Sequence, residues 1–290
     1  MSGPPYRSTT ANIGGVPTVP IDVPICAVFI VLFVFGAICH MTLLVTNSRR
    51  GHRFRLSGML FGYNMARITT CVMRIVWATR KTNVRIAIAA NVFSNAGVFI
   101  AFIVNLVLAQ RLCLSVFPGL RKTFKTAFTA LYVLVVLILA ASITAIVQSV
   151  YTLRTDIHRI DRDIQLTAIT MIFVIACLPL PLVLLAVVAA RRHPPLPFGA
   201  GSWNGKVMTL MTTTLLAVTV AGFRLGTTWE TPRAATDPAW YDARWCYYFF
   251  NFVMDIAIIY AFLVARIDKR FHTLSKEEEE ARSRSAKMES

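Results

Sequence analysis

The chain has 290 residues, of which 56% are hydrophobic and only 15% are charged, and its formal net charge is +16 at pH 7. Charged residues make up about 25% of a typical soluble domain, so this composition excludes a soluble globular protein. The basic residues lie between long uncharged runs and form no domain-wide patch, so we expect no nucleic-acid partner.

The long apolar runs predict an all-α, polytopic membrane protein built as a seven-helix bundle. A run of about 20 apolar residues crosses the roughly 30 Å of hydrocarbon in a bilayer, and membrane lipids then surround the helices. The chain contains seven such runs, near residues 24–46, 56–79, 86–110, 127–150, 166–190, 207–228 and 245–265.

The connecting segments predict how the bundle is oriented. The segments after the first, third and fifth runs, together with the start of the tail, carry more Lys and Arg than the segments on the opposite side. The positive-inside rule therefore favours an external N-terminus and a cytoplasmic C-terminus. We expect a disordered extracytoplasmic segment over residues 1–23, a transmembrane domain over 24–266 and a charged cytoplasmic tail over 267–290.

The second run is unusual because it contains two arginines. Arg67 falls near its middle and Arg74 lies farther outward. A charged side chain at such depth costs at least about 2.5 to 3.5 kcal/mol on insertion scales, so it normally faces a protein interior, a wet cavity or a partner. Helical spacing predicts one polar stripe, formed by Tyr63, Asn64, Arg67, Thr70, Cys71 and Arg74.

Polar residues also follow one arc of the third run. Asn91, Ser94, Asn95 and Asn105 fall within it at helical spacing. We assign Asn105 to interhelical hydrogen bonding, which often contributes only about 0.6 kcal/mol per contact. Asn95 lies close enough to mid-depth to join a site.

The fifth run is interrupted by two prolines in the sequence ACLPLPL. Pro179 and Pro181 remove backbone hydrogen-bond donors, which predicts a bend in the helix.

The seventh run contains Asp255, the only acid within any predicted span, with Asn251 and Tyr248 on the same helical face. Asp255 lies near the bilayer centre, at the depth expected for Arg67, so the two residues are expected to pair. Such a pair serves either as an interhelical clamp or as part of a functional site.

Arg74 and Arg224 are both expected about 10 Å outward of the midplane. If they converge, they form an anion-attracting cavity suited to a phosphate or carboxylate headgroup. The alternatives are that each extends to the outer interface, or that they pair with acids of the loop after the sixth run. Those acids are Glu230, Asp237 and Asp242.

Catalytic signatures are missing from the sequence. Neither HExxH nor GxSxG occurs, the histidines are scattered, and no predicted span contains a lysine that could form a retinal Schiff base. We therefore expect no enzyme activity, no metal and no cofactor. The candidate ligand-binding residues are Arg67, Arg74, Asn95, Arg224, Asn251 and Asp255.

Three stretches carry a resemblance to a known family. They are HMTLLVTNSRRGHRFRLSGMLFGYNMARI, FRLGTTWETP and PAWYDARWCYYFFNFVMDIAIIYAFLVARIDKRFH. In these stretches the chain resembles a fungal family of seven-span integral membrane proteins of unknown function. The resemblance implies the seven-span plan and no particular activity.

The chain is more distantly similar to the fungal lipid-translocating exporter-like family. Its members tend to carry an Arg and a nearby Glu at the end of span 6 and an acid opening span 7. Here Arg224 and Glu230 are six residues apart, and Asp242 stands near the last place. This similarity implies lipid handling.

Receptors coupled to G proteins share the predicted topology. The third run, however, ends in AQRLC without the usual acidic-Arg-Tyr triplet, and the seventh has NFVMD where the common receptor pattern has Asn-Pro. A receptor of the largest class is therefore disfavoured.

Three functions remain open at the level of sequence. The preferred hypothesis is binding or translocation of a lipid or amphiphile, with Arg67 and Asp255 as a midplane pair and Arg74 and Arg224 as anion contacts. The second is a receptor-like sensor whose basic cytoplasmic loops, including residues 121–125, bind a protein partner. The third is a structural membrane component in which every polar residue serves packing.

Overall fold

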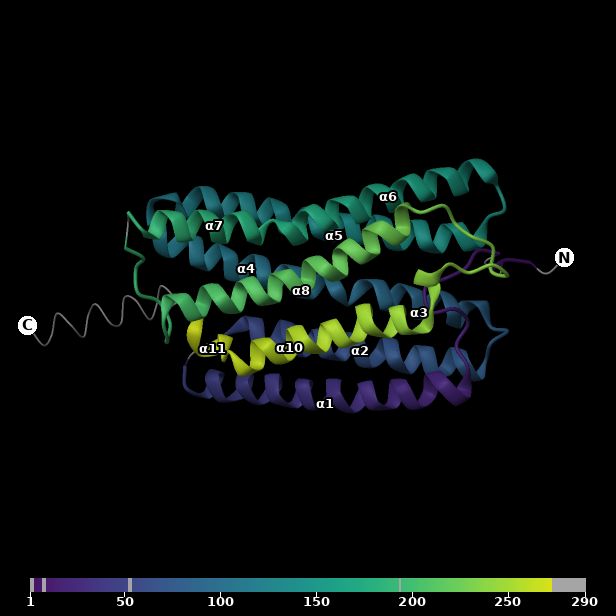
Figure 1. Cartoon of the computed structure of the whole chain (residues 1–290), viewed down its shortest axis with the longest axis horizontal. Helices are drawn as coiled ribbons and strands as arrows, with labels where there is room; N and C mark the ends of the chain where they lie inside the picture. The colour runs from purple at the N-terminus through teal and green to yellow at the C-terminus, as the bar shows by residue number, and fades with distance from the viewer. Residues whose placement is uncertain (1–2, 7–8, 52–53, 193, 273–290) are drawn as a thin grey trace, which may run out of the picture.

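The computed structural model describes residues 3–6, 9–51, 54–192 and 194–272, and every regular element within them is a helix. The predicted all-α class is confirmed. Most helices run along the long axis of a bundle (Figure 1). The α-helices are α1 (Val19–Arg49), α2 (Arg55–Thr79), α3 (Val84–Ala96), α4 (Val98–Val116), α5 (Arg121–Tyr151), α6 (Thr155–Cys177), α7 (Pro179–Ala190), α8 (Trp203–Trp229), α9 (Arg244–Tyr248), α10 (Met254–Val264) and α11 (Ile267–Arg270). Short 3-10 helices η1 (Pro118–Leu120) and η2 (Trp240–Asp242) and a π-helix η3 (Phe249–Val253) complete the set for the described residues.

Six helical stretches of the described chain are long and apolar enough to cross a membrane. The protein is therefore a multi-pass membrane protein by the length and composition of its helices. The stretches are Val19–Arg49, Val84–Val116, Pro118–Tyr151, Thr155–Ala190, Trp203–Trp229 and Arg244–Val264.

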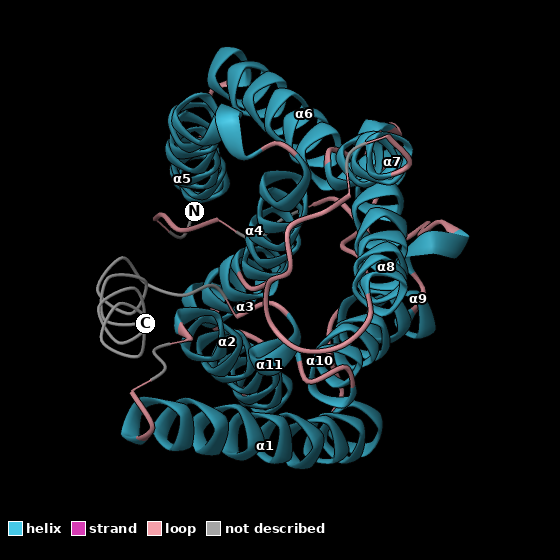
Figure 2. Ribbon diagram, turned by 90° about the vertical axis from the view of Figure 1, so that its left-hand side faces the viewer, coloured by secondary structure: helices cyan, strands magenta, loops and turns pink. Residues whose placement is uncertain are grey.

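Helix α2 is absent from these six because its inward face is polar. It has 25 residues, which corresponds to about 37 Å, and it lies alongside α1 (Figures 1 and 2). Arg67 and Arg74 are buried, whereas Met65 and Val72 are exposed. An apolar exterior around a polar interior is the reverse of what a soluble surface helix shows.

Three of the helical stretches are interrupted or change helix type along their length. The stretch Val84–Val116 breaks at Gly97, between α3 and α4, and the stretch Arg244–Val264 contains the π-helix Phe249–Val253. The stretch Thr155–Ala190 passes from α6 to α7 at Leu178, directly before Pro179, so the predicted bend coincides with a helix boundary. Single π-turns in helices often lie at functional sites because they redirect side chains.

Helices α3 and α4 form the most enclosed stretch of the bundle. In its apolar window 65% of the residues are buried, against 17–44% in the other five stretches, and the end-on view shows the other long helices packed around it (Figure 2). Ser94 and Gly97, at the break between α3 and α4, are buried within this stretch.

The chain before α1 differs from the sequence expectation. The helix begins at Val19, and the preceding N-terminal segment (residues 9–18) is held by backbone hydrogen bonds, including that from Gly14 N to the Asp242 carbonyl at 2.9 Å. Residues 9–18 thus follow a defined path and residues 19–23 belong to α1, whereas the sequence predicted disorder over residues 1–23. Residues 1–2 and 7–8 lie outside the described chain. The tail from 273 onward also lies outside it.

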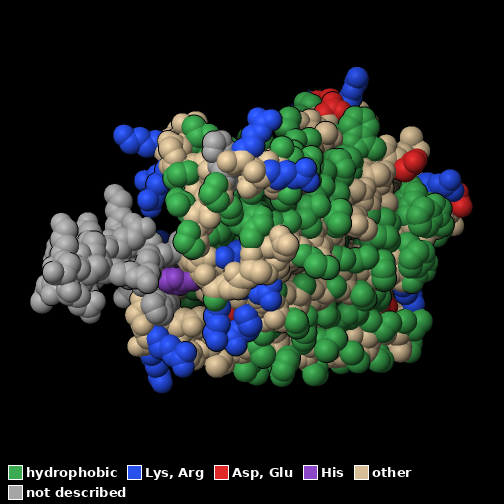
Figure 3. Space-filling view, turned by 60° about the vertical axis from the view of Figure 1, so that its left-hand side comes forward, with side chains coloured by type: hydrophobic (Ala, Val, Ile, Leu, Met, Phe, Trp, Pro, Cys, Tyr) green, Lys and Arg blue, Asp and Glu red, His purple; other side chains and the backbone are tan. Residues whose placement is uncertain are grey.

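The molecular surface carries its charges unevenly. Apolar side chains cover much of the flank, and Lys and Arg gather on the end from which the C-terminus leaves (Figure 3). The N-terminal segment lies at the opposite end (Figure 1).

Candidate functional site

Arg67 of α2 and Asp255 of α10 form an ion pair inside the bundle. Their side chains are 0% and 1% exposed, and Arg67 Nε contacts Asp255 Oδ2. The pairing predicted from their matching depths is therefore present. Arg67 Nη1 also donates a hydrogen bond of 2.9 Å to the Ser94 carbonyl. A Cβ atom at Gly97 would lie 3.1 Å from Arg67 Cζ, so the guanidinium packs directly against the break between α3 and α4.

Arg224 of α8 reaches the same backbone carbonyl from the other side. Its Nη2 donates to the Ser94 carbonyl at 3.0 Å and to Asn251 Oδ1, and its Nη1 donates to Asn95 Oδ1 at 2.9 Å. One carbonyl beside the helix break therefore accepts hydrogen bonds from two arginines. We call this cluster the polar core; its members are Arg67, Ser94, Asn95, Arg224, Asn251 and Asp255.

Arg74 does not join the polar core. It pairs with Asp22 of α1, with distances to Oδ1 of 3.0 Å from Nε and 2.9 Å from Nη2. Its Nη2 also donates to the Gly14 carbonyl at 2.7 Å. Both members of the pair are buried. Arg74 and Arg224 therefore do not share the cavity that the sequence predicted, because Asp22, an acid expected to lie outside the first span, neutralises Arg74.

Asp22 is held by further hydrogen bonds. Its Oδ1 accepts from the Tyr248 hydroxyl at 2.6 Å, and its Oδ2 accepts from the Thr18 backbone N–H at 2.7 Å. Arg244 Nε lies 3.9 Å from the same carboxylate. The pair and its hydrogen-bond partner Tyr248 thus join α1, α2 and α9. Burial of this kind makes removal of one partner costly, by about 3 to 5 kcal/mol.

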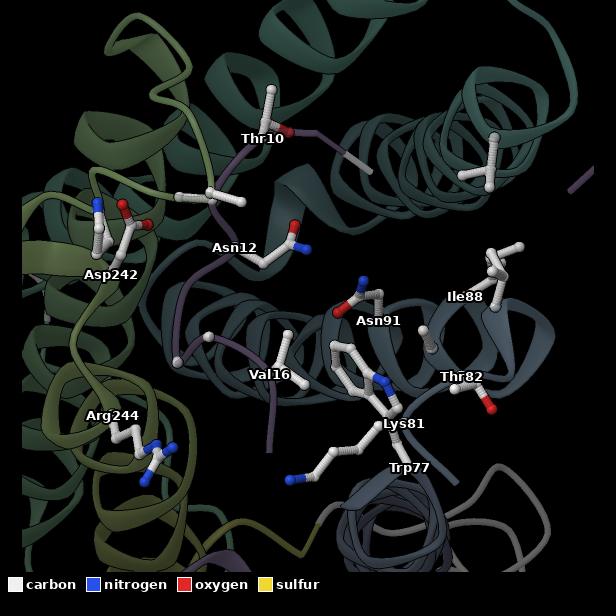
Figure 4. Close-up of a pocket in the computed structure, with 18 of the residues that line it drawn as sticks. Thr10, Asn12, Val16, Trp77, Lys81, Thr82, Ile88, Asn91, Asp242 and Arg244 are labelled. Atoms are coloured by element: carbon white, nitrogen blue, oxygen red, sulfur yellow. The ribbon is translucent and has the colours of Figure 1, made fainter. Parts of the chain in front are cut away.

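A cavity of about 500 Å³ lies at the end of the bundle that carries the N-terminal segment. We call it the N-terminal cavity. Its lining comes from residues 10–16, the ends of α2 and α5, the start of α3, and the segment 235–244. Trp77 and Ile88 supply apolar surface, and Lys81 and Arg244 extend toward the same space (Figure 4). Asp242 also lines the cavity, and its Oδ2 accepts a hydrogen bond from the Ala239 N–H. A cavity with apolar walls, two cations and one acid carries a net positive charge and suits an anionic molecule with an apolar part.

The N-terminal cavity and the polar core are neighbours along α3. Asn91 lines the cavity (Figure 4), and Asn95 Nδ2 donates to the Asn91 carbonyl at 3.0 Å. Arg224 in turn hydrogen-bonds Asn95. One helical turn therefore connects the cavity wall to the polar core.

Asn105 has the packing role that the sequence analysis assigned to it. Its Nδ2 donates to the Thr213 carbonyl at 3.2 Å, and its Oδ1 accepts from the Thr213 hydroxyl at 2.8 Å. These bonds join α4 to α8. Elsewhere in the described chain, no group of three or more His, Cys, Asp or Glu residues is arranged to hold a metal ion.

Five of the six members of the polar core, all except Ser94, were candidate ligand-binding residues from the sequence. The two cations of the N-terminal cavity were not. Lys81 and Arg244 stand in or beside connectors, where a basic residue carries no signal of its own. Only the folding of residues 9–18 over the bundle end brings them to one cavity.

Comparison with known proteins gives one partial match. A family model described as "Protein of unknown function (DUF3112)" matches residues 202–272. This region runs from α8 to α11 and contains Arg224, Asn251 and Asp255. The match is to an uncharacterised family. No curated protein and no solved structure matches the chain.

Proposed function

We propose that the protein is a seven-span membrane protein that binds an anionic lipid or amphiphile in the N-terminal cavity. The N-terminus is extracytoplasmic and the C-terminus cytoplasmic in this proposal. The observation that carries it is the cavity itself, in which apolar walls, two cations and the single acid Asp242 lie at one end of an apolar bundle.

The seventh span is α2. Its length matches a bilayer crossing, its neighbour α1 runs beside it (Figure 1), and its outward residues include Met65 and Val72. The buried arginines are neutralised by Asp255 and Asp22, which lowers the cost of placing them at membrane depth. The gathering of basic side chains at the end opposite the cavity (Figure 3) supports a cytoplasmic C-terminus.

The cavity has the size and chemistry of a small-molecule site. Sites for such ligands commonly occupy about 300 to 1,000 Å³ and combine apolar walls with a few polar groups. Lys81 is exposed. The Arg244 side chain is 35% exposed and lies 3.9 Å from the Asp22 carboxylate, whose charge Arg74 already neutralises, so both cations can meet a carboxylate or phosphate. An acyl chain would lie against Trp77, Val84 and Ile88.

Binding of a fluorescent fatty acid to the purified protein in lipid nanodiscs tests this proposal. We expect the double variant Lys81→Gln/Arg244→Gln to bind the anionic probe at least about tenfold more weakly, since two charge-assisted contacts of about 1.5 kcal/mol or more each are lost. Binding of an uncharged fatty alcohol probe is expected to change little, because its apolar contacts remain.

The matched control is Arg154→Gln, which removes an exposed arginine whose partner, Asp156, is also exposed. It is expected to bind both probes as the wild-type protein does. Equal affinity of the wild type and the double variant for the anionic probe would refute the assignment of the cavity as the headgroup site.

A further inference from the structure

The polar core contains one more positive charge than negative charge. Arg67 is paired with Asp255, whereas Arg224 has no carboxylate within ion-pair distance among the described residues. The nearby acid Asp22 is already paired with Arg74. An uncompensated charge inside a membrane protein is costly.

Several buried polar atoms in and beside the polar core lack a hydrogen-bond partner in the described chain. They are Arg67 Nε and Nη2, Arg224 Nε, the Tyr63 hydroxyl and both Asp255 oxygens. Arg67 Nε and Asp255 Oδ2 are in contact as an ion pair, which leaves Arg67 Nη2 and Arg224 Nε as guanidinium donors without an acceptor. The two guanidinium groups lie side by side because both hydrogen-bond the Ser94 carbonyl. Adjacent guanidinium groups with free N–H donors present the geometry that an anion satisfies.

The surroundings of the two arginines limit the size of what can bind there. The rings of Tyr63 and Phe252 lie 5.7 and 5.9 Å from Arg67 Cζ, and Arg67 is fully buried. Access remains on the other side, since Arg224 is only partly buried and Asn95 is exposed.

From this arrangement we propose that the polar core is a second binding site, which holds a small monovalent anion between Arg67 and Arg224. Its ligand chemistry is that of chloride or a carboxylate group. The anion accepts hydrogen bonds from Arg67 Nη2 and Arg224 Nε and neutralises the excess positive charge. The site uses neither Lys81 nor Arg244, so it does not depend on ligand binding in the N-terminal cavity.

Thermal unfolding of the purified protein at constant ionic strength, with methanesulfonate replaced stepwise by chloride, tests the site. A ligand that binds only the folded state raises the melting temperature as its concentration passes its Kd. We expect a saturable increase for the wild type and none for Arg224→Gln. In chloride-free buffer, Arg224→Gln is expected to melt at or above the wild-type temperature, because the uncompensated charge is gone.

The control variant Arg159→Gln, which removes an exposed arginine of α6, is expected to keep the wild-type chloride response. Arg224→Lys keeps the charge but loses the planar fork, so its chloride midpoint is expected at a higher concentration. This variant tests the site if Arg224→Gln does not fold.

Two further titrations identify the source of the anion. A stabilising response to acetate in the absence of chloride supports a free small anion. A response to decanoate alone supports the carboxylate headgroup of an amphiphile at this site if Arg224→Gln loses it and Lys81→Gln/Arg244→Gln, which alters the N-terminal cavity, keeps it. The proposal is overturned if the wild type responds to none of the three anions, or if Arg224→Gln responds as the wild type does.

Discussion

Replacing Asp22 with Asn removes the charge that neutralises Arg74 and leaves the arginine buried at 2% exposure. The carboxylate accepts bonds from Arg74 at 2.9 and 3.0 Å, from the Tyr248 hydroxyl at 2.6 Å and from the Thr18 N–H at 2.7 Å. Hydrogen bonds to charged groups contribute about 1.5 to 3 kcal/mol each, and breaking a buried ion pair costs about 3 to 5 kcal/mol in total. We expect Asp22→Asn to lower the free energy of unfolding by about 3 to 5 kcal/mol.

A double-mutant cycle with Arg74→Gln separates the pair from its surroundings. Each single variant leaves one charge unpaired, so the double variant is expected to be only about as destabilised as either single one. The coupling energy is then about 3 to 5 kcal/mol, at or above the upper end of the usual 0.5 to 3 kcal/mol. The assay is reversible unfolding in mixed micelles of mild detergent and dodecyl sulfate, followed by circular dichroism.

Strict additivity in that cycle would contradict the ion pair, because independent sites add and neighbours do not. A loss below about 1 kcal/mol for Asp22→Asn would do the same, since surface ion pairs contribute amounts of that size. Either result would mean that α1 begins after Asp22 and that Arg74 is solvated.

Two further predictions concern the break between α3 and α4 and the carboxylate of Asp268 in α11. Gly97→Ala places a methyl group 3.1 Å from Arg67 Cζ and is expected to lower the unfolding midpoint, whereas the control Gly62→Ala meets nothing within 4 Å and is expected to be neutral or stabilising; equal effects of the two variants would refute the close packing of Arg67. Burial alone would raise the pKa of Asp268. Hydrogen bonds to its carboxylate, of which the bond from Arg266 has the largest effect, outweigh the effect of burial and hold the pKa below its usual value of 3.8. The ionised group therefore stabilises the fold above its unfolded pKa, and the stability is lost as pH falls through the folded pKa. Unfolding midpoints measured from neutral pH down through 3.8 are expected to fall less for Asp268→Asn than for the wild type, and parallel curves would show that Asp268 contributes nothing.

The pairing of Arg67 with Asp255 could be predicted from the sequence because both residues stand near the middle of an apolar run. Helix geometry converts position within a run into depth, and an isolated charge at that depth requires a partner. The prediction needed no knowledge of which helices are neighbours.

The partner of Arg74 could not be predicted in the same way. Asp22 lies between Pro20 and Pro24, which favoured a loop. Pro20, however, stands in the first turn of α1, where proline is well tolerated, and the helix continues through Pro24. The segment before it is rich in turn-forming residues and has no periodic pattern, so nothing indicated that Gly14 would reach Arg74.

The role of Ser94 was equally hidden. Its contribution to the polar core is a backbone carbonyl, and a carbonyl has no residue-specific signature. The break at Gly97 that brings this group close to two arginines depends on tertiary packing of Arg67 against the glycine.

The inverted polarity of α2 sets the order in which the bundle can assemble. Arg74 lies 52 positions from its partner Asp22, so a nascent hairpin of α1 and α2 already contains both members of that pair when it enters the bilayer. The partner of Arg67 belongs to α10, the last long element to be synthesised. Until α10 arrives, α2 holds an unneutralised guanidinium group that must face water or a translocation partner. Closing of the bundle is thus coupled to completion of the chain, and a product truncated before α10 would retain a charge by which the cell's quality control could recognise it.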